Sequence, residues 1–360
     1  FRGSGKSTEL YRLEAALDKS RFLVVNYSIR DDLNLSDFDF RDFFVSMALK
    51  VYDIASAESI PLNPDIEKDF QDFAKRITNI TEEEVTSQSS GGLSWSKIIT
   101  LKLSREAKTR QCLRTELDQK ISDLIQRLNW MIMDIENKSG KKLVIIVDDL
   151  DKLARGQQSE DFFYKNYQLL IEPNCFVVYT FPIPLAFNPQ YENVRHAFTG
   201  GEVVLLQMPI WKRNGEKHEA GRKFYSDVIS QRIDRELLGG GVLEYAIEST
   251  GKLTELVEVM KEASLIAYRN GQKEIAKKDV TVALDKLRMT FDRTLTEAHK
   301  QKLLEIDSCK EAREDEPDSV LTRELLFSLT AVEYEDDNEG RWCAVNPMLL
   351  PLVEKWRQSP

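Results

Sequence analysis

Apolar and polar positions in the first part of the chain predict helices that alternate with short buried strands. Apolar residues recur at helical spacing between Leu10 and Leu17, and Arg21 to Tyr27 is then an almost continuous apolar run. Leu143 to Val147 and Cys175 to Phe181 are similar runs, and we also expect a strand over Glu202 to Gln207. Continuous apolar runs are typical of parallel strands covered on both faces. The pattern therefore indicates an α/β fold built on a parallel sheet.

The segment between the first two predicted strands is less regular. Phe38 to Tyr52 has the periodicity of a helix, and Leu113 to Ile135 predicts a long helix. Between them, at residues 55–110, helix-like Ile66 to Ile77 and β-prone Ile98 to Leu103 flank the polar run Thr86 to Gly92. An inserted, partly mobile segment fits this sequence better than a core element.

Beyond Trp211 the sequence changes to charged helical segments separated by glycine-rich breaks, which predicts a compact bundle over residues 211–293. From about residue 294 the pattern predicts a helix at Leu321 to Leu329, then two strands joined by a turn, and a terminal helix opened by Asn346 and Pro347. The predicted domains are therefore 1–210, 211–293 and 294–360, and the alternative for the last is a small α/β appendage that covers the bundle.

Composition narrows the class of protein. The 360 residues are 42% hydrophobic and 31% charged, which suits a globular protein with a substantial core. Apolar runs are too short to span a membrane and the start has no signal-peptide pattern, so we expect a cytoplasmic protein. The 4 cysteines and 3 histidines form no metal-binding motif. A net charge of −10 disfavours broad nucleic-acid binding.

The first eight residues carry the clearest chemical signal. Gly5-Lys6-Ser7 supplies the end of the phosphate-binding pattern G-x-x-x-x-G-K-[ST], whose first glycine would precede Phe1. Glycines allow backbone N–H groups to turn inward around an anion at the start of a helix, with lysine on the phosphates and serine on Mg²⁺. The alternative is a Gly/Ser-rich turn with a solvated lysine. The residues expected to bind the nucleotide are Gly3, Ser4, Gly5, Lys6, Ser7 and Thr8.

A phosphate-binding loop normally follows a central strand, and no residue precedes Phe1 to form one. We therefore expect a chain truncated at its N-terminus. We also expect an unpaired gap in the sheet beside the strand that ends in Asp148.

The second chemical signal lies at Lys142 to Lys152, where five apolar residues run into acidic ones. The acids would follow the carboxyl end of a buried strand, where open α/β sheets bind their ligands. In this position Asp148 would hold Mg²⁺, directly or through water, and Asp149 would orient or polarise the attacking water. Alone, the segment would suit an acidic strand end that caps a turn. Together with Gly5-Lys6-Ser7 it predicts a nucleotide site.

These two stretches and their order resemble those of the AAA+-related signal-transduction ATPases, the STAND class that includes NACHT and NB-ARC proteins, and of the related origin-recognition ATPases. The resemblance implies an AAA+-like P-loop NTPase core, a helical lid and a C-terminal winged helix. It also implies ATP or ADP with Mg²⁺ as ligands, and a nucleotide state coupled to homo-oligomer or partner assembly.

The resemblance implies roles for three further positions. Thr180 lies where such proteins carry a polar sensor-1 residue, although a threonine in a strand is ordinary. Arg195 lies where they carry an arginine finger that acts on a neighbouring subunit, and its alternative is a solvated surface arginine. Thr254 stands where a sensor-2 arginine is expected and cannot replace its charge, so hydrolysis is predicted to be slow. Lys252 is a substitute or, more simply, a solvated lysine.

Asn346 also has two interpretations. The stretch around it resembles the NB-ARC segment whose histidine meets the β-phosphate of ADP, and an asparagine amide can still donate a hydrogen bond to phosphate. The alternative is that Asn346 caps the terminal helix that Pro347 opens.

Two functional classes remain. One is a slowly hydrolysing ATPase switch in which the nucleotide controls assembly or signalling; bacterial proteins with this architecture often belong to defence systems. The other is a DNA-associated ATPase of the origin-recognition type that uses the winged helix. Residues 310–360 contain 6 basic and 12 acidic residues, the wrong balance for a surface that neutralises phosphates, so the switch is preferred and nucleic acid is an unlikely ligand of the winged helix.

Overall fold

The computed structural model describes residues 3–81, 94–153, 157–311, 320–336 and 340–358. They form two compact units, which we treat separately. The sheet unit comprises Lys6–Pro182 and Asn188–Glu202. The helical unit comprises Phe1–Gly5, Ile183–Phe187 and Val203–Pro360.

Three parallel strands form the centre of the sheet unit. They are β1 (Phe22–Ser28), β2 (Lys142–Asp148) and β3 (Phe176–Tyr179), in the order β1-β2-β3. The expected α/β class with a parallel sheet is confirmed. The register sets Ser28 opposite Asp148, so polar side chains from two strands meet at the carboxyl edge of the sheet.

The expected gap beside the strand ending in Asp148 is wrong, because β2 is paired along both edges. Within the described part of this sheet, the two outer strands β1 and β3 each have a partner on one edge only. The sequence of β3 is as apolar as that of β2, yet Phe176 is 58% exposed whereas Ile145 is fully buried. The lower burial of β3 is therefore set by its surroundings in the described sheet and not by its composition.

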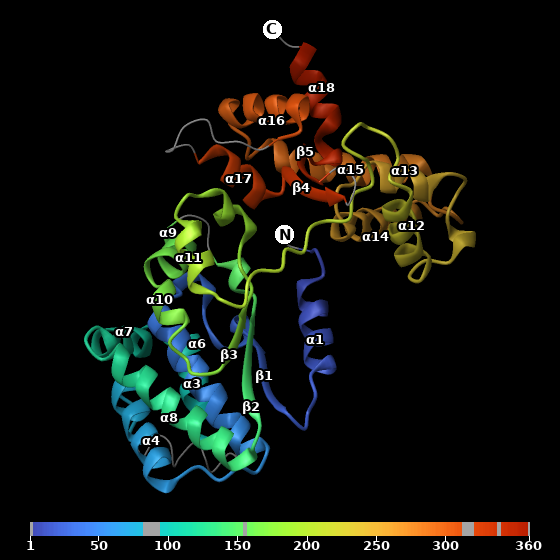
Figure 1. Cartoon of the computed structure of the whole chain (residues 1–360). Helices are drawn as coiled ribbons and strands as arrows, with labels where there is room; N and C mark the ends of the chain where they lie inside the picture. The colour runs from blue at the N-terminus through green and yellow to red at the C-terminus, as the bar shows by residue number, and fades with distance from the viewer. Residues whose placement is uncertain (1–2, 82–93, 154–156, 312–319, 337–339, 359–360) are drawn as a thin grey trace. The chain divides into compact units, whose positions relative to one another are not determined.

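Helices surround these strands, and Figure 1 shows α1 to one side of them and α3 and α8 to the other. The helix α3 packs on α8 and on β1 and is buried along most of its length, with Phe43, Phe44 and Met47 fully buried. The helices of the sheet unit are α1 (Lys6–Ala16), α2 (Ile29–Asp32), α3 (Phe40–Ala57), α4 (Pro64–Thr78), α6 (Trp95–Arg105), α7 (Ala107–Leu117), α8 (Ile121–Ser139), α9 (Gln157–Glu160), α10 (Tyr167–Leu170) and α11 (Tyr191–Ala197).

Two predictions between β1 and β2 are wrong, one inside the inserted segment and one after it. Ile98 to Leu103 lies inside helix α6 and is not a strand, because Ile98, Ile99 and Leu103 form one buried helical face. The long helix predicted over Leu113 to Ile135 is divided into α7 and α8. The polar run over 86–92 lies outside the described residues.

The helical unit contains a bundle with its own apolar core. Fully buried side chains from α13, α14 and α15 meet there, and Met348 from the C-terminal segment joins them. The strand expected over 202–207 is wrong, because in this stretch only Gln207 pairs, through a single bridge to Tyr334. The bundle helices are α12 (Glu219–Ser230), α13 (Val242–Glu248), α14 (Leu253–Arg269) and α15 (Lys277–Asp292).

The C-terminal part of the helical unit combines helices with one antiparallel hairpin. The strands β4 (Ala331–Asp336) and β5 (Gly340–Val345) pair as the sequence predicts. This order of elements is compatible with a winged helix, which stays a prediction. None of the helices within the described residues has the length and apolar character needed to cross a membrane. The helices here are α16 (Glu297–Cys309), α17 (Leu321–Ser328) and α18 (Leu350–Gln358), with the 3₁₀ turn η6 (Pro347–Leu349) before the last.

Candidate functional site

The helix α1 begins at Lys6, and the two residues at its start contact the end of β2. Lys6 Nζ lies 3.0 Å from Asp151 Oδ2, and Ser7 Oγ donates a hydrogen bond to Asp148 Oδ2 at 2.5 Å. The preceding Gly3 and Gly5 have φ of 81° and 90°, a conformation that favours glycine. The two motif segments predicted from the sequence therefore meet in the sheet unit through Lys6 and Ser7.

The chain turns sharply where β2 ends. Asp149 has φ of 70°, in the left-handed region that asparagine and aspartate tolerate better than most residues. The 3₁₀ turn η2 (Leu150–Lys152) follows directly. This turn brings one carboxylate oxygen from each of Asp148, Asp149 and Asp151 within 4.8 Å of the others. We call residues 148–152 the acidic turn.

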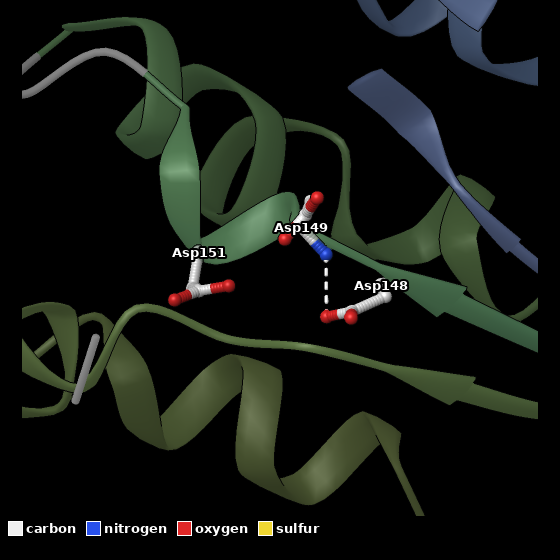
Figure 2. Close-up of side chains that lie close together, drawn as sticks. All are labelled: Asp148, Asp149 and Asp151. Carbon is white, nitrogen blue, oxygen red and sulfur yellow. Dashed lines mark hydrogen bonds between the residues drawn. The ribbon is translucent and has the colours of Figure 1, made fainter. Parts of the chain in front are cut away.

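Side chains from the neighbouring strands hold the acidic turn in place. Thr180, which is buried beyond the end of β3, accepts a hydrogen bond at its Oγ1 from the backbone N–H of Leu150 at 2.9 Å. Ser28, at the end of β1, donates a hydrogen bond to Asp149 Oδ2 at 2.7 Å. The backbone N–H of Asp149 in turn donates to Asp148 Oδ1 at 2.7 Å (Figure 2). Both flanking strands therefore fix the geometry of the acids.

Asp149 has partners on both of its carboxylate oxygens. Lys152 pairs with Oδ1, and Ser28 donates to Oδ2. Burial alone would raise the pKa of Asp149, but the bonds from Lys152 and Ser28 outweigh it and lower the pKa below its ordinary value. The side chain is thus an ionised carboxylate in a fixed position, as the proposed work on an attacking water requires. That role stays a prediction.

Asp151 is the acid that the sequence reasoning did not select. Figure 2 shows the carboxylates of Asp148 and Asp151 facing one another across the turn, with Asp149 above them. Asp151 is 5% exposed, and its buried Oδ1 has no hydrogen-bond partner among the residues that the structure describes. The signal was present in the sequence, because Asp151 belongs to the same Val-Asp-Asp-Leu-Asp-Lys run as the two predicted acids.

The donors at this edge suit a magnesium ion bound with a nucleotide. Mg²⁺ prefers hard oxygen ligands and takes one or two carboxylates together with phosphate oxygens and water. Ser7 Oγ and Asp148 Oδ2 provide two such oxygens side by side, and the unpartnered Asp151 Oδ1 provides a third nearby. When bound, the ion would neutralise charge that develops on the transferred phosphoryl group. Ser7 and Asp148 are the residues that would coordinate the magnesium ion.

Two further predicted site residues of the sheet unit, Thr8 and Arg195, lie on the surface of helices. Thr8 is exposed in the first turn of α1. Arg195 lies on α11 with 47% of its side chain exposed, and its Nη2 pairs with Glu192 Oε2 at 2.7 Å. This position suits either a surface arginine or a group presented to another subunit.

In the helical unit, Gly3 and the start of α14 lie close together. A Cβ atom added to Gly3 would stand 2.7 Å from Thr254 Oγ1, so only glycine fits there without a shift. The residue that replaces the expected sensor-2 arginine is therefore packed against the backbone of the phosphate-binding motif. Ser4 lies between Gly3 and Gly5 and is partly exposed.

The solvated-lysine interpretation of Lys252 is wrong, and its role as a substitute for the expected arginine stays a prediction. It is 5% exposed, and its Nζ pairs with Glu255 Oε1 at 2.7 Å. The same oxygen accepts a hydrogen bond from Asn346 Nδ2 at 2.8 Å, and Glu255 Oε2 accepts one from Gly251 N–H at 3.2 Å. We call these four residues the Glu255 cluster.

Asn346 is fully buried in the Glu255 cluster. Besides its bond to Glu255, its Nδ2 donates to the Leu329 carbonyl at 3.0 Å, and its Oδ1 accepts from Met348 N–H at 3.0 Å. Asn346 therefore caps η6, as one of its two interpretations predicts. Its contact with ADP stays a prediction, and both amide protons already have acceptors.

A surface depression of about 810 Å³ lies elsewhere in the sheet unit. It is lined by Trp130 and Met133 of α8 and by Lys142, where β2 begins. Because α/β sheets bind ligands at the carboxyl ends of their strands, the site at Asp148 is the better candidate.

Searches of known proteins give little further information. No protein-family model matches the chain, and no curated protein matches it. It is similar in structure to Cdc6p from Pyrobaculum aerophilum, with 13% identity and a TM-score of 0.39 over 98% of this chain and 84% of that one. The Aeropyrum pernix ORC1 protein, solved with DNA, gives 15% identity and a TM-score of 0.37 over 98% and 86%. The Aeropyrum pernix ORC2 protein, in ADPNP and ADP complexes, gives 11% and 0.30 over 99% and 94%. Scores this low carry no conclusion about function.

Proposed function

We propose that the chain binds a nucleoside triphosphate, ATP in the first place, together with Mg²⁺ at the carboxyl edge of its sheet. The observation that carries this proposal is that Lys6 and Ser7, at the start of α1, each contact an acid of the acidic turn. These two motif segments are about 140 residues apart in the sequence. The ammonium group of Lys6 and the hydroxyl of Ser7 lie against the carboxylates of Asp151 and Asp148. This is the arrangement that phosphoryl transfer requires, since it depends on positioning and charge neutralisation.

We further propose slow hydrolysis. Asp149 is the candidate for orienting water, with Thr180 fixing the turn that carries it. Thr254 provides no charge at the start of α14, so one source of transition-state stabilisation is absent from that position. A slow ATPase suits a switch whose bound nucleotide changes its assembly or its partners.

The test of the binding site is the Lys6→Ala variant. Removal of the ammonium group should weaken binding of ATP with Mg²⁺ by about tenfold or more, because charge-assisted contacts to phosphate are lost. Isothermal titration calorimetry measures the affinity, and circular dichroism checks the fold. Lys165→Ala, which removes a lysine of a surface ion pair in the same unit, is the matched control. Equal ATP affinity in Lys6→Ala and the control would refute the assignment.

DNA association is the competing function, and the acidic balance of residues 310–360 argues against it. Fluorescence anisotropy with a labelled DNA duplex at low salt decides between the two. Salt-dependent binding in the presence of ATP would favour the DNA-associated ATPase, and its absence favours the switch.

A further inference from the structure

The ion pair between Lys6 and Asp151 has a consequence for how a nucleotide enters the site. The side chain of Lys6 is 17% exposed and that of Asp151 is 5% exposed. The ammonium group of Lys6 directs one of its three N–H donors, and part of its charge, to this buried carboxylate, which weakens the attraction that it can offer to a phosphate. A phosphate group that approaches Lys6 must therefore compete with Asp151.

The acidic turn holds Asp151 in this position. The left-handed conformation of Asp149 reverses the chain, and the bond from Leu150 N–H to Thr180 fixes the residue just before Asp151. Asp151 therefore has little freedom to follow Lys6 if Lys6 moves. The pair is broken by movement of the flexible lysine and not of the aspartate.

Within the described part of the chain, one oxygen of Asp151 pairs with Lys6 and the other is buried without a hydrogen-bond partner. A buried carboxylate that loses its only cation is costly, and the cost is removed when another cation takes its place. The unpartnered Oδ1 belongs to the group of carboxylates that suits a divalent cation. Loss of Lys6 and gain of a metal ion at Asp151 are therefore coupled.

We propose that Asp151 is an internal counter-ion that competes with phosphate for Lys6, so that a nucleotide binds by exchange: Lys6 exchanges Asp151 for phosphate, and Asp151 exchanges Lys6 for Mg²⁺. This inference rests on the proposed nucleotide site and assigns Asp151 as a positioning residue within it. It explains why a third acid, which neither motif requires, is buried at this edge of the sheet.

The first test needs no nucleotide. Lysine acetylation by a soluble N-hydroxysuccinimide ester, followed by mass spectrometry, measures the accessibility of Lys6 relative to the exposed Lys19. In nucleotide-free parent protein, Lys6 should be acetylated more slowly than Lys19. The Asp151→Asn substitution should raise the acetylation rate of Lys6 by about tenfold, because each 1.4 kcal/mol of lost pairing free energy is a factor of ten. Asp161→Asn, which removes a surface aspartate paired with Lys165, should change nothing. An unchanged Lys6 rate in Asp151→Asn overturns the counter-ion role, whether or not the chain binds nucleotide.

The second test measures ADP binding by calorimetry in EDTA and then with Mg²⁺. Asp151→Asn should bind ADP about tenfold more tightly without the metal, for the same reason, and should gain less from added Mg²⁺ than the parent does. Asp151→Glu retains the charge and should show no such gain. If the higher ADP affinity of Asp151→Asn arises from release of Lys6, it should disappear when Asp151→Asn is combined with Lys6→Ala.

An equal rise in ADP affinity in the Lys6→Ala background would show that the Asp151 carboxylate simply repels the phosphate. That result would overturn the proposed exchange of Lys6 between Asp151 and phosphate. Thermal unfolding of every variant, followed by circular dichroism, confirms that the proteins compared are folded. If the parent and all variants fail to bind ADP, the proposed function fails, while the acetylation result still decides whether Asp151 holds Lys6.

Discussion

The acidic turn of the sheet unit and the Glu255 cluster of the helical unit both bury charged groups, but they differ in how completely those groups are paired. In the Glu255 cluster, both oxygens of Glu255 accept hydrogen bonds and Asn346 uses its oxygen and its amide nitrogen. In the acidic turn, one buried oxygen of Asp151 has no hydrogen-bond partner in the described ranges, and Ser7, which bonds to the turn, is exposed.

The difference indicates which region is built for stability and which for ligands. A fully paired cluster gains nothing from a further ligand and is expensive to disrupt. A cluster with a spare acceptor beside an exposed hydroxyl can exchange its internal partners for external ones. We therefore expect substitutions in the Glu255 cluster to affect stability, and substitutions in the acidic turn to affect binding.

The largest loss of stability is expected for Glu255→Gln. This change leaves the Lys252 ammonium group buried without a countercharge and should destabilise the helical unit by about 3–5 kcal/mol. Hydrogen exchange of α13 and α14, measured by mass spectrometry, reports the loss within that unit. The double variant Lys252→Met/Glu255→Gln removes both charges and should recover much of it. A loss below about 1 kcal/mol in Glu255→Gln would mean that the pair of Lys252 and Glu255 is as weak as a surface ion pair. The contrast in stability between the Glu255 cluster and the acidic turn would then be wrong.

A smaller loss is expected for Asn346→Ala. The change removes the cap of η6 and the donors to Glu255 and to the Leu329 carbonyl, for a total of about 1–2 kcal/mol. Hydrogen exchange of α14 and α18 measures it. Asn346→Ser, which keeps a capping oxygen, should lose less.

The same variant tests the predicted lock on ADP. Since the amide of Asn346 is already bonded within the helical unit, Asn346→Ala should leave the ratio of ADP to ATP affinity unchanged in calorimetry. A specific weakening of ADP binding would show that the amide reaches the phosphates, and the Glu255 cluster would then be a part of the nucleotide site.

The elements of the fold were largely predictable because their apolar periodicity was strong. The buried strand β2 lies within a residue of its predicted bounds, and the helices α13, α14 and α15 lie within the bundle predicted over residues 211–293. The failures share a physical cause. The stretch at 98–103 is apolar at spacings that both a strand and a helix can bury, and its packing on α2, α3 and α7 selects the helix. The stretch at 202–207 has strand-like composition but has only a single bridge to a partner, which no local pattern reveals.

The site was predictable in its motifs but not in its pairing. Lys6, Ser7 and Asp148 were selected because their types and spacing match a known chemistry. Asp151 was missed because its importance depends on the left-handed turn at Asp149, which carries the chain back toward Lys6. The burial of Lys252 was missed for a similar reason. Its partner Glu255 is close in the sequence, but Asn346, which bonds to the same oxygen of Glu255, lies 91 residues from Glu255.

A pH-dependent effect of still smaller size is expected at Asp149. The pKa of Asp149 is lower in the folded chain than in the unfolded chain, where it is about 3.9. The bonds of Asp149 to Lys152 and Ser28 therefore stabilise the sheet unit at pH values above the unfolded pKa. This contribution is lost as the pH falls through the lower pKa of the folded chain. Asp149→Asn should cost less than about 1 kcal/mol at pH 7, because Lys152 is partly exposed and water screens the pair.

Hydrogen exchange of β1 and β2 in the parent and in Asp149→Asn, measured from pH 7 down to pH 3, checks the sign. The difference in stability between the two proteins should be constant near neutral pH and should shrink below about pH 4. A difference that grows on acidification would mean that the folded chain favours the protonated acid, and the carboxylate would not suit the orientation of water.

The smallest effect on stability is expected for Arg195→Ala, because the side chain and its partner Glu192 are both largely exposed. The change should leave the melting temperature as it is. It should lower ATP turnover several-fold only at protein concentrations where chains associate, and a concentration series of the hydrolysis rate measures this. Lys165→Ala, in another exposed ion pair, is the control and should have no effect at any concentration. Turnover equal to that of the parent throughout the series would leave Arg195 as a surface residue. An exposed pair with Glu192 is a weak competitor for a guanidinium group, so Arg195 can leave it for a neighbour's phosphate far more easily than Lys252 can leave Glu255.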